Sequence, residues 1–97
     1  MSEAVTELLA QLVDVTQPPP AADDPEALLT AFDAMVATRA ALLAQLEARM
    51  PVPLSDAARA LGEELRARDH AWLAALGLAR QTVADRLGAV RRAQRRS

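Results

Sequence analysis

Few side chains in this sequence are of the types that carry out covalent or metal chemistry. His70 is the only histidine, and the chain contains no cysteine. A histidine on a helix surface can carry a phosphoryl group, and Arg66 and Arg68 lie near it in the sequence. One histidine with scattered acids does not make a closed set of metal ligands. We therefore interpret His70 as a solvated or interface residue.

The remaining polar residues contain no catalytic motif. The acids form no carboxylate pair that helix capping or surface charge cannot explain, and no glycine-rich loop follows a strand pattern. The sequence predicts a protein that is not an enzyme and that holds no cofactor or metal. The absence of cysteine also excludes a disulfide framework, which fits a cytoplasmic location.

The composition predicts an all-α fold in one small domain, residues 1–97. Apolar residues make up 52% of the chain, Ala and Leu dominate, and Phe32 and Trp72 are the only aromatic residues. No segment alternates apolar and polar residues as a strand does. No uninterrupted apolar stretch approaches eighteen residues and no basic segment leads into an apolar run, which argues against a membrane span and a signal peptide.

Start and stop signals divide the chain into three predicted helices. The first covers about residues 2–16, with Ser2 as its N-cap and one apolar face. A linker at residues 17–23 ends it with three consecutive prolines, and leaves the direction of this helix open. The second helix covers about residues 25–49 and the third about residues 55–96, and the two are separated by Pro51-Val52-Pro53.

So short a connection makes the second and third helices antiparallel neighbours in a long hairpin. The third helix carries a narrow apolar stripe with an eleven-residue repeat, whereas the stripe of the second is wider and predicts two neighbours. Pairing the helices outward from the loop brings Phe32 near Trp72 and Leu28 or Leu29 near Leu76. We expect the hairpin and the short first helix to complete a bundle by oligomerisation.

The same pairing places Arg39 within one helical turn of Asp69, and each interrupts the apolar stripe of its helix. One interpretation is a buried polar site. The other, which we favour, is an ion pair between the helices that fixes their register.

Two sets of residues are candidates for contact with another protein. The first set lies beside the core stripe of the second helix and consists of Leu29, Val36 and Leu43. The second set lies on the third helix, on the side away from Trp72, and consists of Ala67, Ala71, Ala74 and Leu78. Small side chains allow helices to approach closely, so the second set predicts a partner chain or the first helix as its neighbour.

Charge is unevenly distributed along the chain. Residues 1–58 carry nine acids and two arginines, whereas residues 59–97 carry nine arginines and four acids. This separation favours contacts within the hairpin or between two copies. The arginines of residues 91–97 suit the negative end of the helix macrodipole. Nucleic acid or an anionic membrane is a less favoured alternative, because no aromatic residues are interleaved for stacking.

Several runs together resemble the FliT family of flagellar export chaperones, over about residues 8–92. They are Pro25-Glu26-Ala27-Leu28-Leu29, the run from Thr38 to Leu46, the proline break, and Leu61 through Arg68-Asp69 to Arg92. The resemblance implies a small cytoplasmic helical protein that binds a filament-cap subunit or export-apparatus components and can form a homodimer. The proline-rich linker departs from the family pattern. The resemblance covers no counterpart of the regulatory helix into which members often continue, so autoinhibition by such a helix is not expected from it.

Two functional hypotheses follow. In the first, the chain is a non-enzymatic protein-binding module that resembles an export chaperone and holds a client on an exposed apolar helix face. In the second, it is a structural homo-oligomerisation module without a client, and a second copy covers the same apolar surface.

Overall fold

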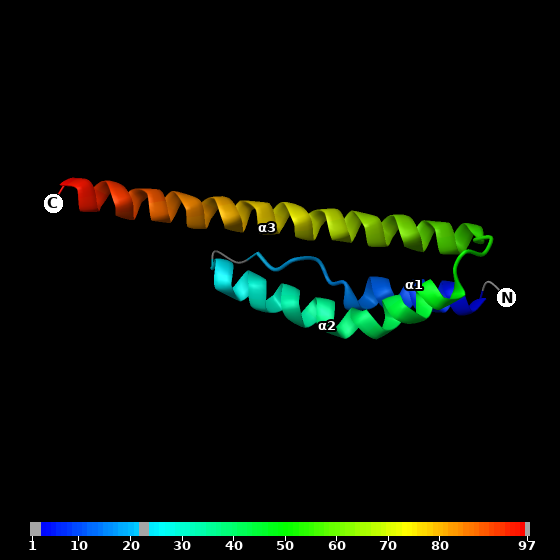
Figure 1. The fold of residues 1–97 in the computed structure, drawn as a ribbon. Coiled ribbons are helices and arrows are strands. Elements are labelled where there is room, and N and C mark those ends of the chain that lie inside the picture. Colours follow the sequence, from blue (N-terminus) through cyan, green and yellow to red (C-terminus); the bar gives the residue numbers. More distant parts are fainter. Residues whose placement is uncertain (1–2, 22–23, 97) are drawn as a thin grey trace.

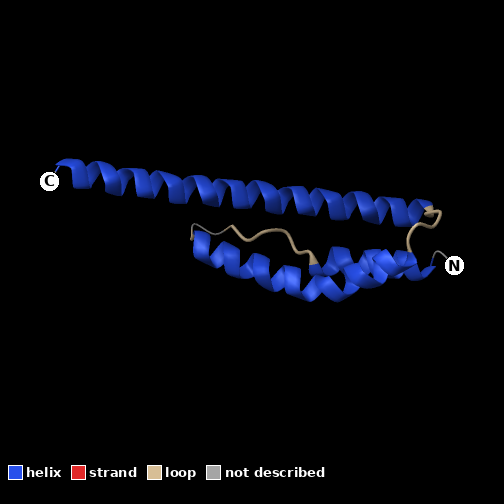
Figure 2. Ribbon diagram, viewed as in Figure 1, coloured by secondary structure: helices blue, strands red, loops and turns tan. Residues whose placement is uncertain are grey.

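The fold consists of three α-helices, α1 (Glu3–Val15), α2 (Pro25–Arg49) and α3 (Asp56–Arg96) (Figures 1 and 2). They are seen in a computed structural model that describes residues 3–21 and 24–96, and these ranges contain no strand. The all-α prediction is confirmed. Each helix begins and ends within one residue of its predicted bounds.

The starts of α2 and α3 are fixed by side-chain caps. The Asp24 carboxylate accepts a hydrogen bond from the backbone N–H of Glu26 at 3.1 Å, and Pro25 occupies the first helical position. The Ser55 hydroxyl accepts one from the backbone N–H of Ala58 at 3.1 Å. In both cases a side-chain oxygen satisfies an N–H that has no partner inside the helix.

α2 and α3 form the predicted antiparallel hairpin (Figure 1). Phe32 on α2 packs against Trp72 on α3, with ring centroids 5.8 Å apart and ring planes tilted by 50°. Tilted aromatic pairs at this distance are favourable beyond the area that they bury. The contact confirms the register predicted from the sequence.

α1 lies at the end of the molecule where the hairpin turns, and it runs antiparallel to α2 (Figure 1). It packs against both α2 and α3, so α2 has the two neighbours that its wide stripe predicted. Its buried face consists of the five apolar residues expected from the sequence, Val5, Leu8, Leu9, Leu12 and Val13. Ser2, the predicted cap of α1, lies outside the described residues.

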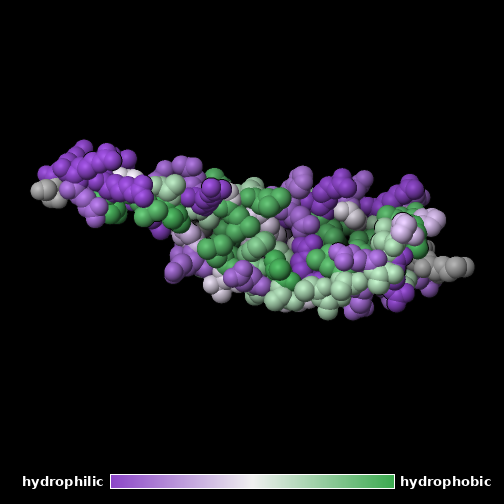
Figure 3. Space-filling model, in the orientation of Figure 1, coloured by the Kyte–Doolittle hydropathy of each residue, from purple (hydrophilic) through white to green (hydrophobic). Residues whose placement is uncertain are grey.

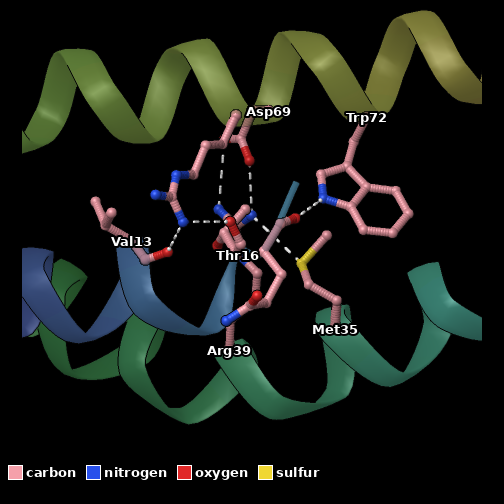
Figure 4. A network of polar contacts seen from close by, with 8 residues as sticks. Val13, Thr16, Met35, Arg39, Asp69 and Trp72 are labelled. Atoms are coloured by element: carbon pink, nitrogen blue, oxygen red, sulfur yellow. Dashed lines mark hydrogen bonds and ion pairs between the residues drawn. The ribbon is translucent and has the colours of Figure 1, made fainter. Parts of the chain in front are cut away.

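Hydrogen bonds from α3 hold the end of α1 and the first residue of the linker. Arg68 Nη1 donates to the carbonyl oxygens of Val13 at 2.7 Å and Thr16 at 3.1 Å. The indole Nε1 of Trp72 donates to the carbonyl of Gln17 at 2.7 Å (Figure 4). The described part of the linker then continues toward the start of α2 (Figure 1).

The buried apolar residues form two clusters along the hairpin. The cluster near the turn contains Val5, Leu9 and Ala58, with Leu46, Val52, Leu54, Leu61 and Leu65 packed against it. The cluster in the middle contains Leu28, Met35 and Trp72, with Ala31, Phe32, Ala75, Leu76 and Ala79 packed against it. The second cluster confirms that Leu28 lies near Leu76.

α3 is much longer than its partner, with 41 residues against 25 in α2. The molecule is accordingly extended, measuring 68 × 21 × 21 Å, and the C-terminal part of α3 projects beyond α2 (Figure 1). Val83, Leu87 and Val90 continue the apolar stripe there but are 42%, 51% and 52% exposed. The apolar stripe of α3 thus continues past the start of α2 at Pro25 and is left partly uncovered there.

Candidate protein-binding groove

Two adjoining apolar cavities lie in the groove between α2 and α3, with volumes of about 330 and 410 Å³. Both are lined by residues of these two helices, and Phe32 lines both of them. The lining of the first is Phe32, Met35, Val36, Arg39, Leu43, Asp69, Trp72 and Leu73. That of the second is Pro25, Leu29, Phe32, Leu76, Ala79, Arg80 and Val83. We call this continuous surface the α2/α3 groove.

Several large apolar side chains of the α2/α3 groove face solvent. Leu29 is 50% exposed, Val36 is 42% exposed and Leu73 is 66% exposed. Figure 3 shows hydrophobic side chains gathered on one face in the middle of the molecule. A single exposed leucine is ordinary on a protein surface, but a contiguous apolar patch marks a site of contact with another molecule.

One ion pair lies within the α2/α3 groove (Figure 4). Arg39 Nη1 lies 2.7 Å from Asp69 Oδ1, and Nη2 lies 3.4 Å from Oδ2. Arg39 Nη1 also contacts the sulfur of Met35 at 3.7 Å. The Arg39 side chain is only 11% exposed, whereas that of Asp69 is 40% exposed. The two-pronged geometry ties α2 to α3 at one register, and water still reaches the carboxylate.

The structure separates the two sets of predicted contact residues. Leu29, Val36 and Leu43 all line the α2/α3 groove. The other set lies on the opposite side of α3, where all four residues are exposed: Ala67, Ala71, Ala74 and Leu78. Leu78 is 71% exposed, so α1 does not cover this face. We call it the small-residue face.

Leu73 belongs to the groove but was not among the predicted contact residues. It follows Trp72 directly, so its side chain points about 100° away from the centre of the α3 stripe. The narrow stripe of α3 predicts its core contact, and the small-residue face predicts a second contact on the far side of the helix, so Leu73 falls between the two. The signal that could have identified Leu73 is the ion pair, because Asp69 lies one turn before it on the same edge of α3.

The residues considered for chemistry do not converge at the groove. His70 is exposed. Among residues 3–21 and 24–96, no three His, Cys, Asp or Glu side chains are grouped as metal ligands would be. The C-terminal arginines Arg91, Arg92, Arg95 and Arg96 are exposed on the projecting part of α3. The polar side chains of the groove lining are Arg39, Asp69 and Arg80.

By length and composition alone, α2 is long and apolar enough to cross a membrane. The sequence contains no uninterrupted apolar run of this length, as expected, but α2 is apolar enough on average although it includes charged residues. Core helices of soluble proteins and signal sequences pass the same test. In this structure α2 packs along α1 and α3 and shares the groove with α3.

Comparison of the chain with protein-family models, with curated proteins and with solved structures gives no match. The resemblance to flagellar export chaperones stays a prediction made from the sequence pattern. The structure does show a small, extended helical protein with exposed apolar residues, which is consistent with a binding or oligomerisation module.

Proposed function

We propose that this chain is a non-enzymatic binding module that holds an apolar helical segment of another protein in the α2/α3 groove. The observation that carries the proposal is the exposure of Leu29, Val36 and Leu73 on one continuous apolar surface between two helices. Burial of such side chains against a partner is favourable, because it removes apolar surface from water.

The groove has the dimensions of a helix-binding site. Its α2 wall extends from Pro25 to Leu43, which at 1.5 Å per residue is about 27 Å, or five turns of a bound helix. Recognition of an amphipathic helix uses apolar anchors spaced by three, four or seven residues. On α2, Leu29, Val36 and Leu43 are also spaced by seven residues. They can therefore contact anchors of the same spacing on a helix that lies in the groove.

The identity of the client comes from the resemblance described above. A relative of the FliT chaperones would bind an export substrate such as a filament-cap subunit, or a component of the export apparatus, and would do so in the cytoplasm. The groove supports a protein client of helical, apolar character, and the family pattern supplies the flagellar assignment.

The test is calorimetric titration of a flagellar filament-cap subunit and of soluble export-apparatus components into the wild-type chain and two variants. The double variant Leu29→Glu, Val36→Glu places charges in the groove and should lose binding. The matched control, Ala71→Glu with Leu78→Glu, places the same charges on the small-residue face and should bind normally. Circular dichroism checks that both variants remain helical.

The two parts of the proposal fail separately in this experiment. Absence of binding to any of these flagellar proteins overturns the flagellar assignment. A groove variant that binds as tightly as the wild-type chain overturns the groove as the binding site.

A further inference from the structure

One row of side chains on α3 lines the α2/α3 groove along its whole length. It consists of five residues at alternating spacings of four and three, Asp69, Leu73, Leu76, Arg80 and Val83. At about 100° per residue, these spacings keep all five side chains on one side of the helix. We call this row the groove edge of α3.

The groove edge continues past the start of α2 onto the projecting end of α3. Leu87 and Arg91 follow Val83 at spacings of four residues, and Val83 and Leu87 are 42% and 51% exposed. Figure 3 shows hydrophobic side chains among hydrophilic ones on this end of the molecule. From Asp69 to Arg91 the edge is about 33 Å long, or six turns of a bound helix. A helix in the groove can therefore keep contact with α3 beyond its last contact with α2.

The charged side chains of the groove edge change along its length. Asp69, Arg80 and Arg91 are spaced by eleven residues, which is about three helical turns. The Asp69 carboxylate is paired with Arg39, so together they contribute no net charge. Arg80 and Arg91 are exposed, and neither belongs to an ion pair in the described part of the chain. The edge thus carries a neutral pair toward the end where the hairpin turns and two unpaired cations toward the projecting end.

The same sign prevails over the rest of the projecting end. Residues 80–96 contain six arginines and one acid, Asp85, which accepts a hydrogen bond from the Gln81 side chain at 2.9 Å. Cations in the last turn of a helix complement its macrodipole. Arg80 lies about four turns before the end of α3, so the macrodipole does not account for it. An acidic partner of Arg80 and Arg91 has to come from another molecule.

We propose that the client helix held in the α2/α3 groove is acidic in its C-terminal half, runs parallel to α3 and extends over the projecting end. Its acids pair with Arg80 and Arg91, and its apolar side chains cover Val83 and Leu87. The inference rests on the proposed function, because it specifies the chemistry and the direction of the same client.

The direction follows from the macrodipole of the bound helix. A helix carries partial positive charge at its N-terminus and partial negative charge at its C-terminus. A client parallel to α3 places its C-terminus beside Arg91 and the arginines that follow. A client in the opposite direction would place its positive end there instead.

The Arg39–Asp69 pair restricts the other half of the client. The Asp69 side chain is 40% exposed in the groove, whereas that of Arg39 is 11% exposed. An acid of the client at this point would meet the Asp69 carboxylate, and a cation would compete with Arg39 for it. Unfavourable contacts of this kind select against wrong partners. The N-terminal half of the client should therefore be uncharged where it passes the pair.

The first test compares three fluorescein-labelled peptides of about 22 residues, the length that spans the groove edge at 1.5 Å per residue. All share one seam of leucines, and they carry glutamates in the C-terminal half, the same glutamates in the N-terminal half, or lysines in the C-terminal half. Fluorescence anisotropy should show about tenfold tighter binding of the first peptide than of the second, and the third should bind most weakly. Acids near a C-terminus lower the helicity of the free peptide, which opposes the expected order. Equal binding of the first two peptides overturns the proposal.

A charge reversal tests whether the groove edge makes this distinction. The variant Arg80→Glu, Arg91→Glu should bind the lysine peptide most tightly. The matched control Arg92→Glu, Arg96→Glu changes the net charge equally on the side of α3 away from the groove edge, and should keep the wild-type order. Circular dichroism checks that both variants are helical. A control that loses the preference as fully as the test variant indicates general attraction to the arginines and overturns the proposal.

Disulfide formation tests the direction, because the chain contains no cysteine of its own. The C-terminal glutamate peptide is made with a cysteine at either end and oxidised with the variants Leu73→Cys and Leu87→Cys. A helix parallel to α3 joins its N-terminal cysteine to position 73 and its C-terminal cysteine to position 87. The reverse pairing overturns the proposed direction.

The outcomes separate this inference from the proposed function. Flagellar proteins that bind the wild-type chain and the Arg80→Glu, Arg91→Glu variant equally, but not the Leu29→Glu, Val36→Glu variant, retain the function and refute the acidic client. Failure of every peptide to bind also refutes the inference, while the flagellar proteins test the function independently. A chain that binds a second copy, DNA or anionic vesicles through the projecting end, and binds no peptide there, assigns that end to the other ligand and refutes the inference.

Discussion

The two ends of the molecule are built from the same kind of sequence but differ in how many neighbours each helix has. At the turn end, three helices pack together, and Leu12 and Ala58 are completely buried. At the other end α3 continues alone, and Leu87 and Val90 remain about half exposed. The apolar stripe of a helix needs a neighbouring surface to cover it. This chain provides such a neighbour from its own helices only at the turn end.

The turn end therefore contributes mainly to the stability of the fold, and the open end mainly to association with other molecules. Burial of apolar area at the turn end supplies free energy to the fold, whereas area left open in the groove and on the projecting end is available for association. The middle of the hairpin is intermediate, because Trp72 is buried while Leu73, the next residue, is 66% exposed. Substitutions at the two ends should therefore have different effects, and the following predictions run from the largest expected effect to the smallest.

The largest effect should come from Leu12→Ala at the closed end. Its side chain is fully buried between helices, so truncation should lower the free energy of unfolding by about 3 kcal/mol. Leu87→Ala on the projecting end removes the same atoms from an exposed site and should change it by less than about 0.5 kcal/mol. Urea denaturation at a concentration below that of any self-association measures both. Equal losses would contradict the contrast between the ends.

Removal of either partner of the Arg39–Asp69 pair should have the next largest effect. Asp69→Leu leaves the Arg39 guanidinium mostly buried without its partner, and should cost about 2 kcal/mol of unfolding free energy. The double variant Arg39→Leu, Asp69→Leu removes both charges and should lie closer to wild type than either single variant. Losses in the double variant that equal the sum of the two single losses would mean that the two side chains act independently.

Arg68→Met should loosen the attachment of α1 with a smaller loss, about 1.5 kcal/mol. The substitution removes the donor to the carbonyls of Val13 and Thr16 but keeps most of the side-chain volume. Hydrogen exchange of the α1 amides should increase more than that of the α3 amides. Arg66→Met, at an exposed position two residues earlier, is the matched control. Faster exchange in the control as well would indicate a general effect on α3.

The smallest effect should be a gain, from Gly77→Ala near the small-residue face. A β-carbon at Gly77 would meet nothing within 4 Å, so the substitution should stabilise α3 by about 1 kcal/mol through helix propensity. Gly62→Ala, also in open space, should behave similarly. Thermal unfolding measures both changes. A variant at Gly77 that loses stability or self-association would show that this face is packed closely against a partner.

Much of the fold could be predicted because its signals are local. The Asp24 and Ser55 caps and the proline breaks fix the helix bounds, and the short loop fixes the hairpin register closely enough to place Phe32 beside Trp72. Of the two walls of the α2/α3 groove, only the α2 wall was predicted from the sequence. The α2 wall was identified because its stripe is too wide for one neighbour, whereas the α3 wall at Leu73 was missed.

The reason lies in what periodicity measures. The repeat of apolar residues gives the direction of each side chain about the axis of its own helix, and from this the sequence alone determined the helices, their stripes and the pairing of α2 with α3. Burial depends on where a neighbouring helix begins, ends and leans, which is a property of the packed chain. Only the tertiary structure decided that α1 runs back along α2, that Arg68 and Trp72 hold the end of α1 and the start of the linker, and that the groove stays open while α3 extends past its partner.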